Sequence, residues 1–371
     1  MIYLDNAATT YPKPKKVLKS VEDCIKKYCG NPGRSSHFFS IKTSERIFEA
    51  RESVARILGH TRPENVVFTQ NATYALNMAI KGCVSFGDHV LISDIEHNSV
   101  LRPLVALKKE GVIDFSVYNS FGNIENNIEK EIKPNTRLLI SSLSSNVFGR
   151  KIPLDILYSV ASKYNLILIL DASQLLGHEE IDVSGMRGYI VCAPVHKGLF
   201  GVQGAGFLCV CEDISLKPIL EGGSGNESKN PEMPMYLPER LEAGTLSSPA
   251  IISVIEGVKF IEKQGISEIN RKMKMISDRY ADILRENKHC VVYDYNESLI
   301  SFNVASKSAS EVAYEFNKYG VAVRSGLHCS PLAHKLLGTE NIGTVRISFS
   351  YFNRPRESDI FFKALKNVTS L

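Results

Sequence analysis

A histidine–lysine pair precedes four glycines in the segment APVHKGLFGVQGAG, residues 193–206. In a nucleotide-binding P-loop the lysine follows the glycines and precedes a serine or threonine, whereas Lys197 comes before them. The segment is therefore not predicted to be a P-loop. Two interpretations of Lys197 remain: a solvated loop lysine, or an amine used in covalent chemistry, because a partly desolvated lysine loses its proton readily.

Asp171 favours the second interpretation, because it ends the apolar run LILILD. A carboxylate in apolar surroundings stabilises a cation, so Asp171 would keep a pyridinium N–H charged. Residues after other predicted strands could contact the ring face, the phenolic oxygen and the phosphate of one ligand: His97, then Asn146 and Gln174, then Thr73 and His196. Together these residues predict a pyridoxal-phosphate pocket in which Lys197 is the Schiff-base amine.

Short apolar runs with helical patterns between them would position these groups. The runs are typical of strands buried on both faces and cover residues 65–69, 89–94, 113–118, 137–142, 166–171, 189–193 and 206–211. Helical spacing is found over 72–83, 99–111 and 153–165. The alternation predicts a seven-stranded, mostly parallel α/β sheet, with ligands bound at the carboxyl ends of the strands.

The pattern changes after about residue 245. Two long helical stretches, 250–265 and 268–288, precede strands and helices of an α+β type, including a helix near 309–319. We expect an N-terminal arm near the small domain, a large cofactor-binding domain and a small C-terminal domain that carries Cys329: residues 1–13, 14–245 and 246–371. The Gly/Asn/Pro-rich stretch 221–239 is expected to cover a site or a partner, because it is too long for a plain connection.

Composition excludes several classes of partner. The 371 residues carry a net charge of +4 without a basic stripe, so neither nucleic acid nor an anionic membrane is expected. The sequence has no predicted signal peptide or membrane-spanning run, which favours a cytoplasmic protein. The eight cysteines show no zinc-site spacing, so no metal is expected, and Cys209 and Cys211 are predicted to be core residues.

Eight motifs stand in an order that resembles the class V aminotransferase group, and most closely its cysteine desulfurases and selenocysteine lyases. Between residue 2 and about residue 353 they read YLDNAATT, NAT, EHNS, SNVFG, DASQ, HKG, EAGT and RSGLHCSP. The resemblance implies a two-domain, fold-type-I pyridoxal-phosphate enzyme and a homodimer with shared active sites. It further implies that sulfur leaves L-cysteine as a cysteine persulfide, with alanine as the other product.

The resemblance also assigns roles to single residues. Lys197 matches the cofactor-binding lysine, Asp171 the partner of the ring nitrogen, and Cys329 the nucleophile, while His97 matches the ring-stacking and catalytic histidine. Further cofactor contacts match Ala72, Thr73, Asn146, Gln174, His196 and, from the neighbouring subunit, Thr245. Substrate contacts match Asn146, Ala7, Arg324 and Arg346, the last as the clamp for the substrate carboxylate.

The RSGLHC segment lacks a long insertion around Cys329, which is similar to the second group of desulfurases. A short tether limits how far a persulfide can move, so the resemblance implies an acceptor protein that comes to the site. Pro194 and Val195 stand where relatives usually have Ser-Gly, which removes one phosphate hydroxyl, and Ser330 stands where alanine is common. A lost hydrogen bond to a charged group weakens cofactor retention by about 1.5–3 kcal/mol.

Three alternatives remain open from sequence. The first is a lyase for L-selenocysteine or another class V aminotransferase or C–S lyase. The second is a non-catalytic sulfur-relay scaffold, which the departures at Pro194 and Val195 favour. The third, a nicotinamide dehydrogenase, is disfavoured because no GxGxxG follows the first predicted strand.

Overall fold

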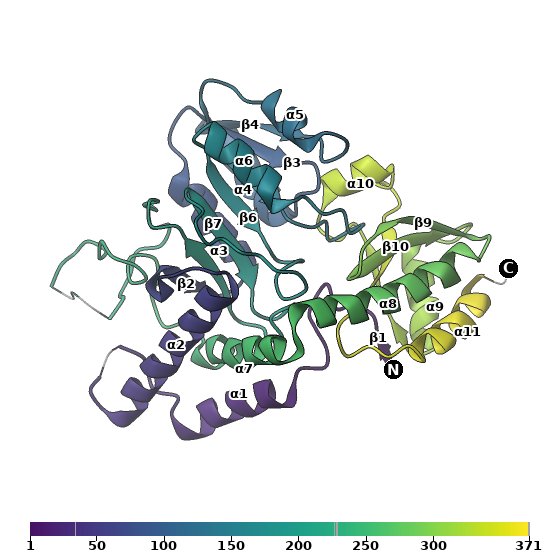
Figure 1. Cartoon of the computed structure of the whole chain (residues 1–371), viewed down its shortest axis with the longest axis horizontal. Helices are drawn as coiled ribbons and strands as arrows, with labels where there is room; N and C mark the ends of the chain where they lie inside the picture. The colour runs from purple at the N-terminus through teal and green to yellow at the C-terminus, as the bar shows by residue number, and fades with distance from the viewer. Residues whose placement is uncertain (34, 226, 228, 370–371) are drawn as a thin grey trace.

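The computed structural model describes residues 1–33, 35–225, 227 and 229–369, and its centre is a seven-stranded sheet (Figure 1). The strand order is β2-β8-β7-β6-β5-β3-β4, and β8 alone runs antiparallel to its neighbours. The strands are β2 (Val66–Thr69), β3 (Asp88–Ser93), β4 (Ile113–Tyr118), β5 (Thr136–Ser142), β6 (Ile167–Asp171), β7 (Tyr189–Pro194) and β8 (Gly206–Val210). All seven predicted strands are confirmed, each boundary to within one residue.

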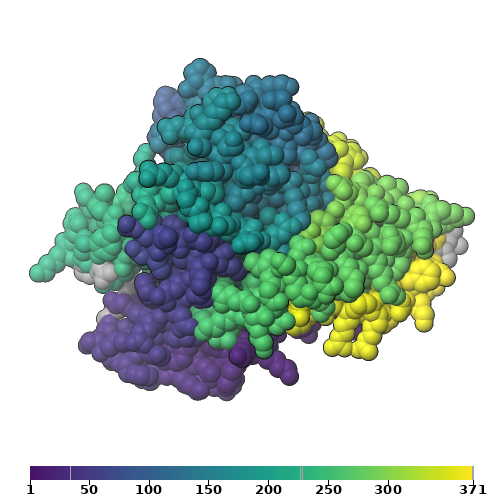
Figure 2. Space-filling view, in the orientation of Figure 1, coloured from purple at the N-terminus to yellow at the C-terminus, as the bar shows by residue number. Residues whose placement is uncertain are grey.

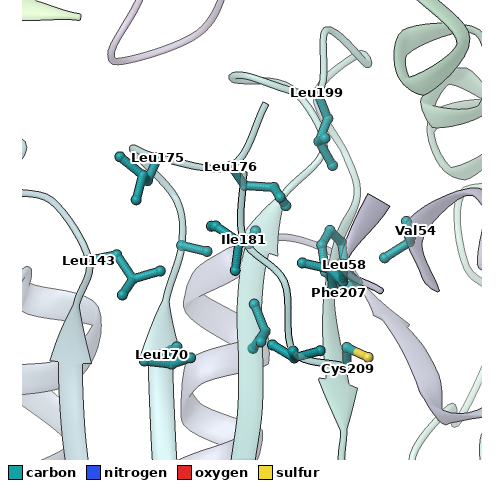
Figure 3. Close-up of a cluster of buried hydrophobic side chains, with 14 of the residues drawn as sticks. Val54, Leu58, Leu143, Leu170, Leu175, Leu176, Ile181, Leu199, Phe207 and Cys209 are labelled. Atoms are coloured by element: carbon teal, nitrogen blue, oxygen red, sulfur yellow. The ribbon is translucent and has the colours of Figure 1, made fainter. Parts of the chain in front are cut away.

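The strands are buried on both faces because successive apolar side chains point to opposite sides. Along β6, Leu168 and Leu170 join one hydrophobic core whereas Ile169 joins the other. Figure 3 shows part of the first core, to which Leu58 and the sheet residues Leu170 and Phe207 belong. The predicted core residues Cys209 and Cys211 belong to it and are buried.

Helices cover both faces of the sheet. Residues of α3 (Ala72–Cys83) and α4 (Asn98–Lys109) complete one core. The opposite core receives residues from α2 (Phe38–Ile57), α5 (Ile124–Glu129), α6 (Leu154–Lys163) and α7 (Ser248–Gln264). A short 3-10 turn, η1 (Pro63–Asn65), leads into β2, and α1 (Lys15–Lys27) packs against α7.

A second, smaller sheet has the order β12-β13-β10-β9 and is antiparallel throughout. Its strands are β9 (Cys290–Tyr295), β10 (Leu299–Val304), β12 (Arg324–Gly326) and β13 (Thr344–Ser348). Its core includes residues of α8 (Ile266–Arg285), α9 (Ala309–Lys318) and α11 (Glu357–Thr369), and α10 (Pro331–Leu337) follows β12. The predicted α+β character of this region is confirmed.

The N-terminal residues lie along the small domain. Strand β1 (Ile2–Tyr3) pairs in parallel with β11 (Val321–Ala322), and Ile2 and Leu4 join the small core. Beyond β1 the chain crosses to the large domain, where Thr10 Oγ1 donates to the Lys197 carbonyl at 2.8 Å. The arm thus touches both domains.

The division between the two cores falls inside α8. Its residues Ile269 and Met273 join the core of the large sheet, whereas Ile276 and the following apolar residues join the small core. Since α7 also packs on the large domain, this criterion favours a later boundary than the expected one at 245–246, which stays a prediction. The end of strand–helix alternation marked that boundary, but the alternation does not reveal what a following helix packs against. We propose a boundary near residue 274.

The segment between β8 and α7 contains the Gly/Asn/Pro-rich stretch. Its described part has no helix or strand and projects from the large domain on the side of β2 and α2 (Figure 1). In the space-filling view the large domain and the green-to-yellow small domain meet along a continuous boundary (Figure 2). Among the described residues, no helix combines the length and the apolar character that a membrane crossing requires.

Candidate active site

A cavity of about 130 Å³ lies where the parallel strands of the large sheet end, which is room for about four water molecules. It collects side chains that follow five different strands. Of the residues predicted from sequence, those that line it are Ala72, Thr73, His97, Asn146, Asp171, Gln174, His196 and Lys197. The shared carboxyl edge of the sheet therefore brings together groups that are up to 125 residues apart in sequence, from position 72 to position 197.

Lys197 follows β7 at the turn that begins with His196. Burial lowers the pKa of its amine to about 8, the Asp171 carboxylate opposes this shift, and Arg346 adds to it. The turn is held by the N-terminal arm, because the His196 carbonyl accepts from Lys13 Nζ at 2.6 Å and from Thr9 Oγ1 at 3.2 Å. The amine is therefore positioned and partly deprotonated near neutral pH.

His97 is the N-cap residue of α4. Its Nδ1 accepts from the Ser99 backbone N–H at 3.0 Å and lies 2.8 Å from Ser99 Oγ. Because Nδ1 is the acceptor, the proton of the neutral imidazole is on Nε2. Burial lowers the pKa of His97 to about 4, so the ring is neutral at physiological pH.

Ser99 extends this hydrogen-bonded chain to the other end of the cavity, since its Oγ lies 2.8 Å from Thr73 Oγ1. Thr73 is in the first turn of α3, and Asn71 caps that helix by accepting from the Tyr74 N–H at 2.9 Å. Helix N-termini attract anions through their free N–H groups and the helix dipole. The α3 end of the cavity is thus suited to a phosphate.

Arg346 lies on β13 and is almost completely buried, with burial lowering its pKa to about 10. Its Nη2 contacts Asp5 Oδ1 at 3.0 Å and its Nη1 donates to the Asn146 carbonyl at 2.8 Å. Arg324 on β12 pairs with Arg346 in register. The Arg346 guanidinium is the predicted clamp for the substrate carboxylate, and one of its edges is already bonded to the Asp5 carboxylate.

Ala7 of the arm and Gln174 of the cavity are linked, because the Ala7 carbonyl accepts from Gln174 Nε2 at 3.2 Å. The Ala7 N–H donates to Ser348 Oγ at 2.8 Å, which connects the same residue to the end of β13. Gln174, predicted to contact the phenolic oxygen, is thus oriented by the arm.

Cys329 is exposed and lies in the loop between β12 and α10. His328 and Cys329 have φ angles of 47° and 61°, in the left-handed region that residues other than glycine rarely adopt. The Cys329 carbonyl accepts from the Asn98 N–H at 2.7 Å, directly after His97 in sequence. The loop is therefore docked beside the His97 side of the cavity.

Five predicted site residues are not among those lining the cavity: Ala7, Thr245, Arg324, Cys329 and Arg346. Ala7 and Arg346 contact lining residues directly, as described above. Thr245 is exposed and sits just before α7. Its predicted role toward a neighbouring subunit stays a prediction.

The aminotransferase class V family profile matches residues 2–361. The chain belongs to the aminotransferase class V family. This family is pyridoxal-phosphate dependent. A probable cysteine desulfurase of Methanothermobacter thermautotrophicus is 30% identical over 383 residues, and the match covers 100% of this chain and 95% of the relative. A probable cysteine desulfurase of Pyrococcus abyssi is 29% identical, and the match covers 99% of this chain and 94% of the relative.

Solved structures agree with the fold. The apo structure of a cysteine desulfurase from Thermococcus onnurineus has a TM-score of 0.90 and 28% identity, covering 99% of this chain and 94% of that one. The Escherichia coli cysteine desulfurase CsdA in its S-sulfonic acid form has a TM-score of 0.87 at 23% identity, with 99% and 94% coverage, and supports the fold alone. The predicted two-domain α/β class is confirmed.

The residues of the cavity fit the family's cofactor. The Nδ1 atom of His196 is buried and has no hydrogen-bond partner among the described residues, so it is available to a ligand. Gly206 lets β8 approach the start of α3, because a Cβ there would lie 2.4 Å from the Asn71 carbonyl carbon. An amine, a carboxylate and a helix N-terminus around one cavity match an aldehyde, a pyridine nitrogen and a phosphate.

Pro194 lines the cavity beside these groups and contributes neither a hydroxyl nor an N–H. The loss of a phosphate donor at this position stays a prediction.

The sequence analysis missed several polar lining residues: Asn71, Ser99, Ser142 and Ser144. Ser99 stood in the EHNS motif, so its nearness to His97 could have been predicted from the N-cap pattern. Within the described ranges no three His, Cys, Asp or Glu side chains gather as possible metal ligands.

Proposed function

We propose that this protein is a pyridoxal-phosphate-dependent cysteine desulfurase. It removes sulfur from L-cysteine, releases L-alanine and keeps the sulfur as a persulfide on Cys329. One observation carries the proposal: Lys197 and Asp171 line one cavity, and the Cys329 loop is bonded to the residue that follows His97. The similarity to cysteine desulfurases over nearly the whole chain supports the same activity.

When bound, the cofactor supplies an electron sink that stabilises negative charge on the substrate carbon skeleton. Thr73, His196 and the first turn of α3 would hold its phosphate, and Asp171 would keep its ring nitrogen protonated. Lys197 would bind its aldehyde carbon covalently, because an amine with a pKa of about 8 is partly neutral at physiological pH.

His97 would donate a hydrogen bond from its Nε2–H, because its Nδ1 already accepts one from Ser99. It would also transfer protons to and from the substrate. The remaining free edge of Arg346 would bind the substrate carboxylate, because its buried Nε has no partner among the described residues.

Cys329 would attack the substrate sulfur as a thiolate. An S–S bond forms, the C–S bond breaks, and its electron pair stays with the substrate carbon, which takes up a proton to become the methyl group of alanine. The persulfide then carries the sulfane sulfur, and an external thiol or an acceptor protein takes it up and restores the Cys329 thiol.

The test is product analysis with the cofactor-loaded protein. Incubation with L-cysteine and a reducing thiol should give alanine and sulfide in equal amounts. Cys329→Ala should abolish sulfide while the protein keeps its visible cofactor colour, whereas Lys197→Ala should remove the covalent attachment. Unchanged sulfide output from Cys329→Ala would contradict the role of this thiol.

We further propose a homodimer in which Thr245 contacts the phosphate of the neighbouring subunit. Its exposure within one chain supports this role. A mixed dimer of Lys197→Ala and Thr245→Ala chains should recover one intact site in each dimer, and so about half of the activity. No recovery above the two parents would rule out the shared site.

A further inference from the structure

The loop that carries Cys329 is bonded to the large domain at three consecutive residues. The His328 carbonyl accepts from Asn146 Nδ2 at 2.7 Å, and the Cys329 carbonyl accepts from the Asn98 N–H at 2.7 Å. The Ser330 hydroxyl donates to Asn146 Oδ1 at 2.6 Å. Two of these three bonds therefore use the single side chain of Asn146.

Asn146 also connects this loop to the rest of the site. It lines the cavity, and its carbonyl accepts from Arg346 Nη1 at 2.8 Å. Because Ser330 is completely buried and Asn146 almost so, water cannot replace a missing donor at low cost. The amide is fixed with Oδ1 toward Ser330 and Nδ2 toward His328, which settles its orientation.

The backbone of the loop needs this support. His328 and Cys329 both have positive φ angles, and such conformations persist where neighbouring contacts hold them in place. The His328 ring adds one contact on the other side, since its Nε2 lies 3.0 Å from Thr344 Oγ1 on β13. The loop is thus held between the small sheet and the large domain, with the Cys329 residue exposed.

We infer that Ser330 is a positioning residue for sulfur transfer: its hydroxyl locks the Asn146 amide and thereby keeps the Cys329 loop docked at the edge of the cavity. This role rests on the proposed function of Cys329 as the nucleophile. A docked loop presents the persulfide at a fixed place, where an acceptor must meet it.

The Asn98 amide gives a direct measure of docking. Asn98 is the first residue of α4, so its N–H has no acceptor within the helix and donates to the Cys329 carbonyl instead. In Ser330→Ala we expect the Asn98 amide to exchange its hydrogen roughly fivefold faster, the size expected for one neutral hydrogen bond. We expect kcat for alanine formation to fall by a similar factor, with KM for cysteine within about twofold.

Ser358→Ala is the matched control. Ser358 is also completely buried, and its hydroxyl donates to the Pro355 carbonyl at 2.7 Å in a helix remote from the cavity. This variant should leave Asn98 exchange and kcat unchanged. Ser330→Thr keeps the hydroxyl and should restore both values, which a simple packing role would not explain.

An Asn98 exchange rate in Ser330→Ala within twofold of the unmodified protein would overturn the inference, whatever happens to turnover. A change of equal size in Ser358→Ala would overturn it as well, because the effect would then be general loosening. If the unmodified protein forms no alanine, the proposed function fails, while the exchange measurement still tests the docking role of Ser330.

Discussion

Charged groups near Lys197 act on its amine in opposite directions. Burial lowers its pKa, Asp171 raises it, and Arg346 and Arg324 lower it further. The result of about 8 lies well below the ordinary lysine value of about 10.4. The amine is mostly protonated below pH 8 and mostly neutral above it.

This balance predicts the pH dependence of labelling at Lys197 in the cofactor-free protein. Reaction with trinitrobenzenesulfonate, followed by peptide mass spectrometry, should rise with a midpoint near pH 8. Asp171→Asn should move the midpoint to lower pH, because the carboxylate that raises the pKa is gone. A midpoint near pH 10 would show a solvated lysine instead.

A second prediction concerns Pro194, which lines the cavity without offering a donor. Pro194→Ser should restore a hydroxyl toward the phosphate and tighten cofactor binding by about 1.5–3 kcal/mol, or roughly tenfold or more. The dissociation constant of pyridoxal phosphate, measured by equilibrium dialysis, tests this. Equal affinities in the two proteins would mean that the new hydroxyl does not reach the phosphate.

At the scale of elements, α8 links the two hydrophobic cores through one continuous helix. Its first turns pack on the large domain and its later turns on the small one. A helix is stiff over this length, so a substitution that shifts α8 in one core should also change its packing in the other core. The relative placement of the two sheets, and with it the placement of Arg346, depends on this helix.

Ile276→Ala should therefore cost about 2–5 kcal/mol of unfolding free energy, because Ile276 is 1% exposed in the small core. Met275→Ala is the control, since the neighbouring Met275 is 48% exposed and should change stability by less than about 0.5 kcal/mol. Urea unfolding followed by circular dichroism measures both. Similar losses in the two variants would contradict the assignment of faces on α8.

The strands could be predicted closely from sequence, whereas some helices could not. Each strand is a short apolar run between polar turns, and its boundaries follow from that pattern alone. No helix was predicted over α1 or α2. In α2 the side chains of Phe38, Phe39 and Phe48 are exposed, so its apolar residues do not form one stripe.

At the scale of the whole molecule, an ion pair between Lys151 and Glu297 crosses between the domains. Lys151 Nζ lies 2.7 Å from Glu297 Oε2, and Lys151 also contacts Glu179. Glu297 follows β9 in the small domain and is buried. The pair therefore ties the β9–β10 turn to the large domain.

Lys151→Met should destabilise the protein by about 2–3 kcal/mol, because it leaves buried Glu297 without this cation. The cost is below the roughly 3–5 kcal/mol of a fully buried pair, since the Lys151 side chain is 31% exposed. The double variant with Glu297→Gln should recover part of the loss. Thermal unfolding of the three proteins tests this, and an additive double variant would show that the two side chains do not interact.

The cofactor side of the site could be predicted from sequence because its residues end strands of one sheet. The contacts between domains could not. Ser330 and Arg346 of the small domain contact Asn146 of the large domain, 184 and 200 residues away, and only the docking of the two domains brings them together. No local pattern in the sequence encodes such a contact.

The pairing of β1 with β11 has a consequence for synthesis. Ile2 leaves the ribosome 319 residues before its partner Val321, an interval of roughly 15–65 s at ordinary elongation rates. During that time the segment that later supports the Lys197 turn has no strand to pair with. The large sheet can form while translation continues, but a competent catalytic centre must await nearly the whole polypeptide, and a chaperone that shields the nascent amino terminus would raise the yield.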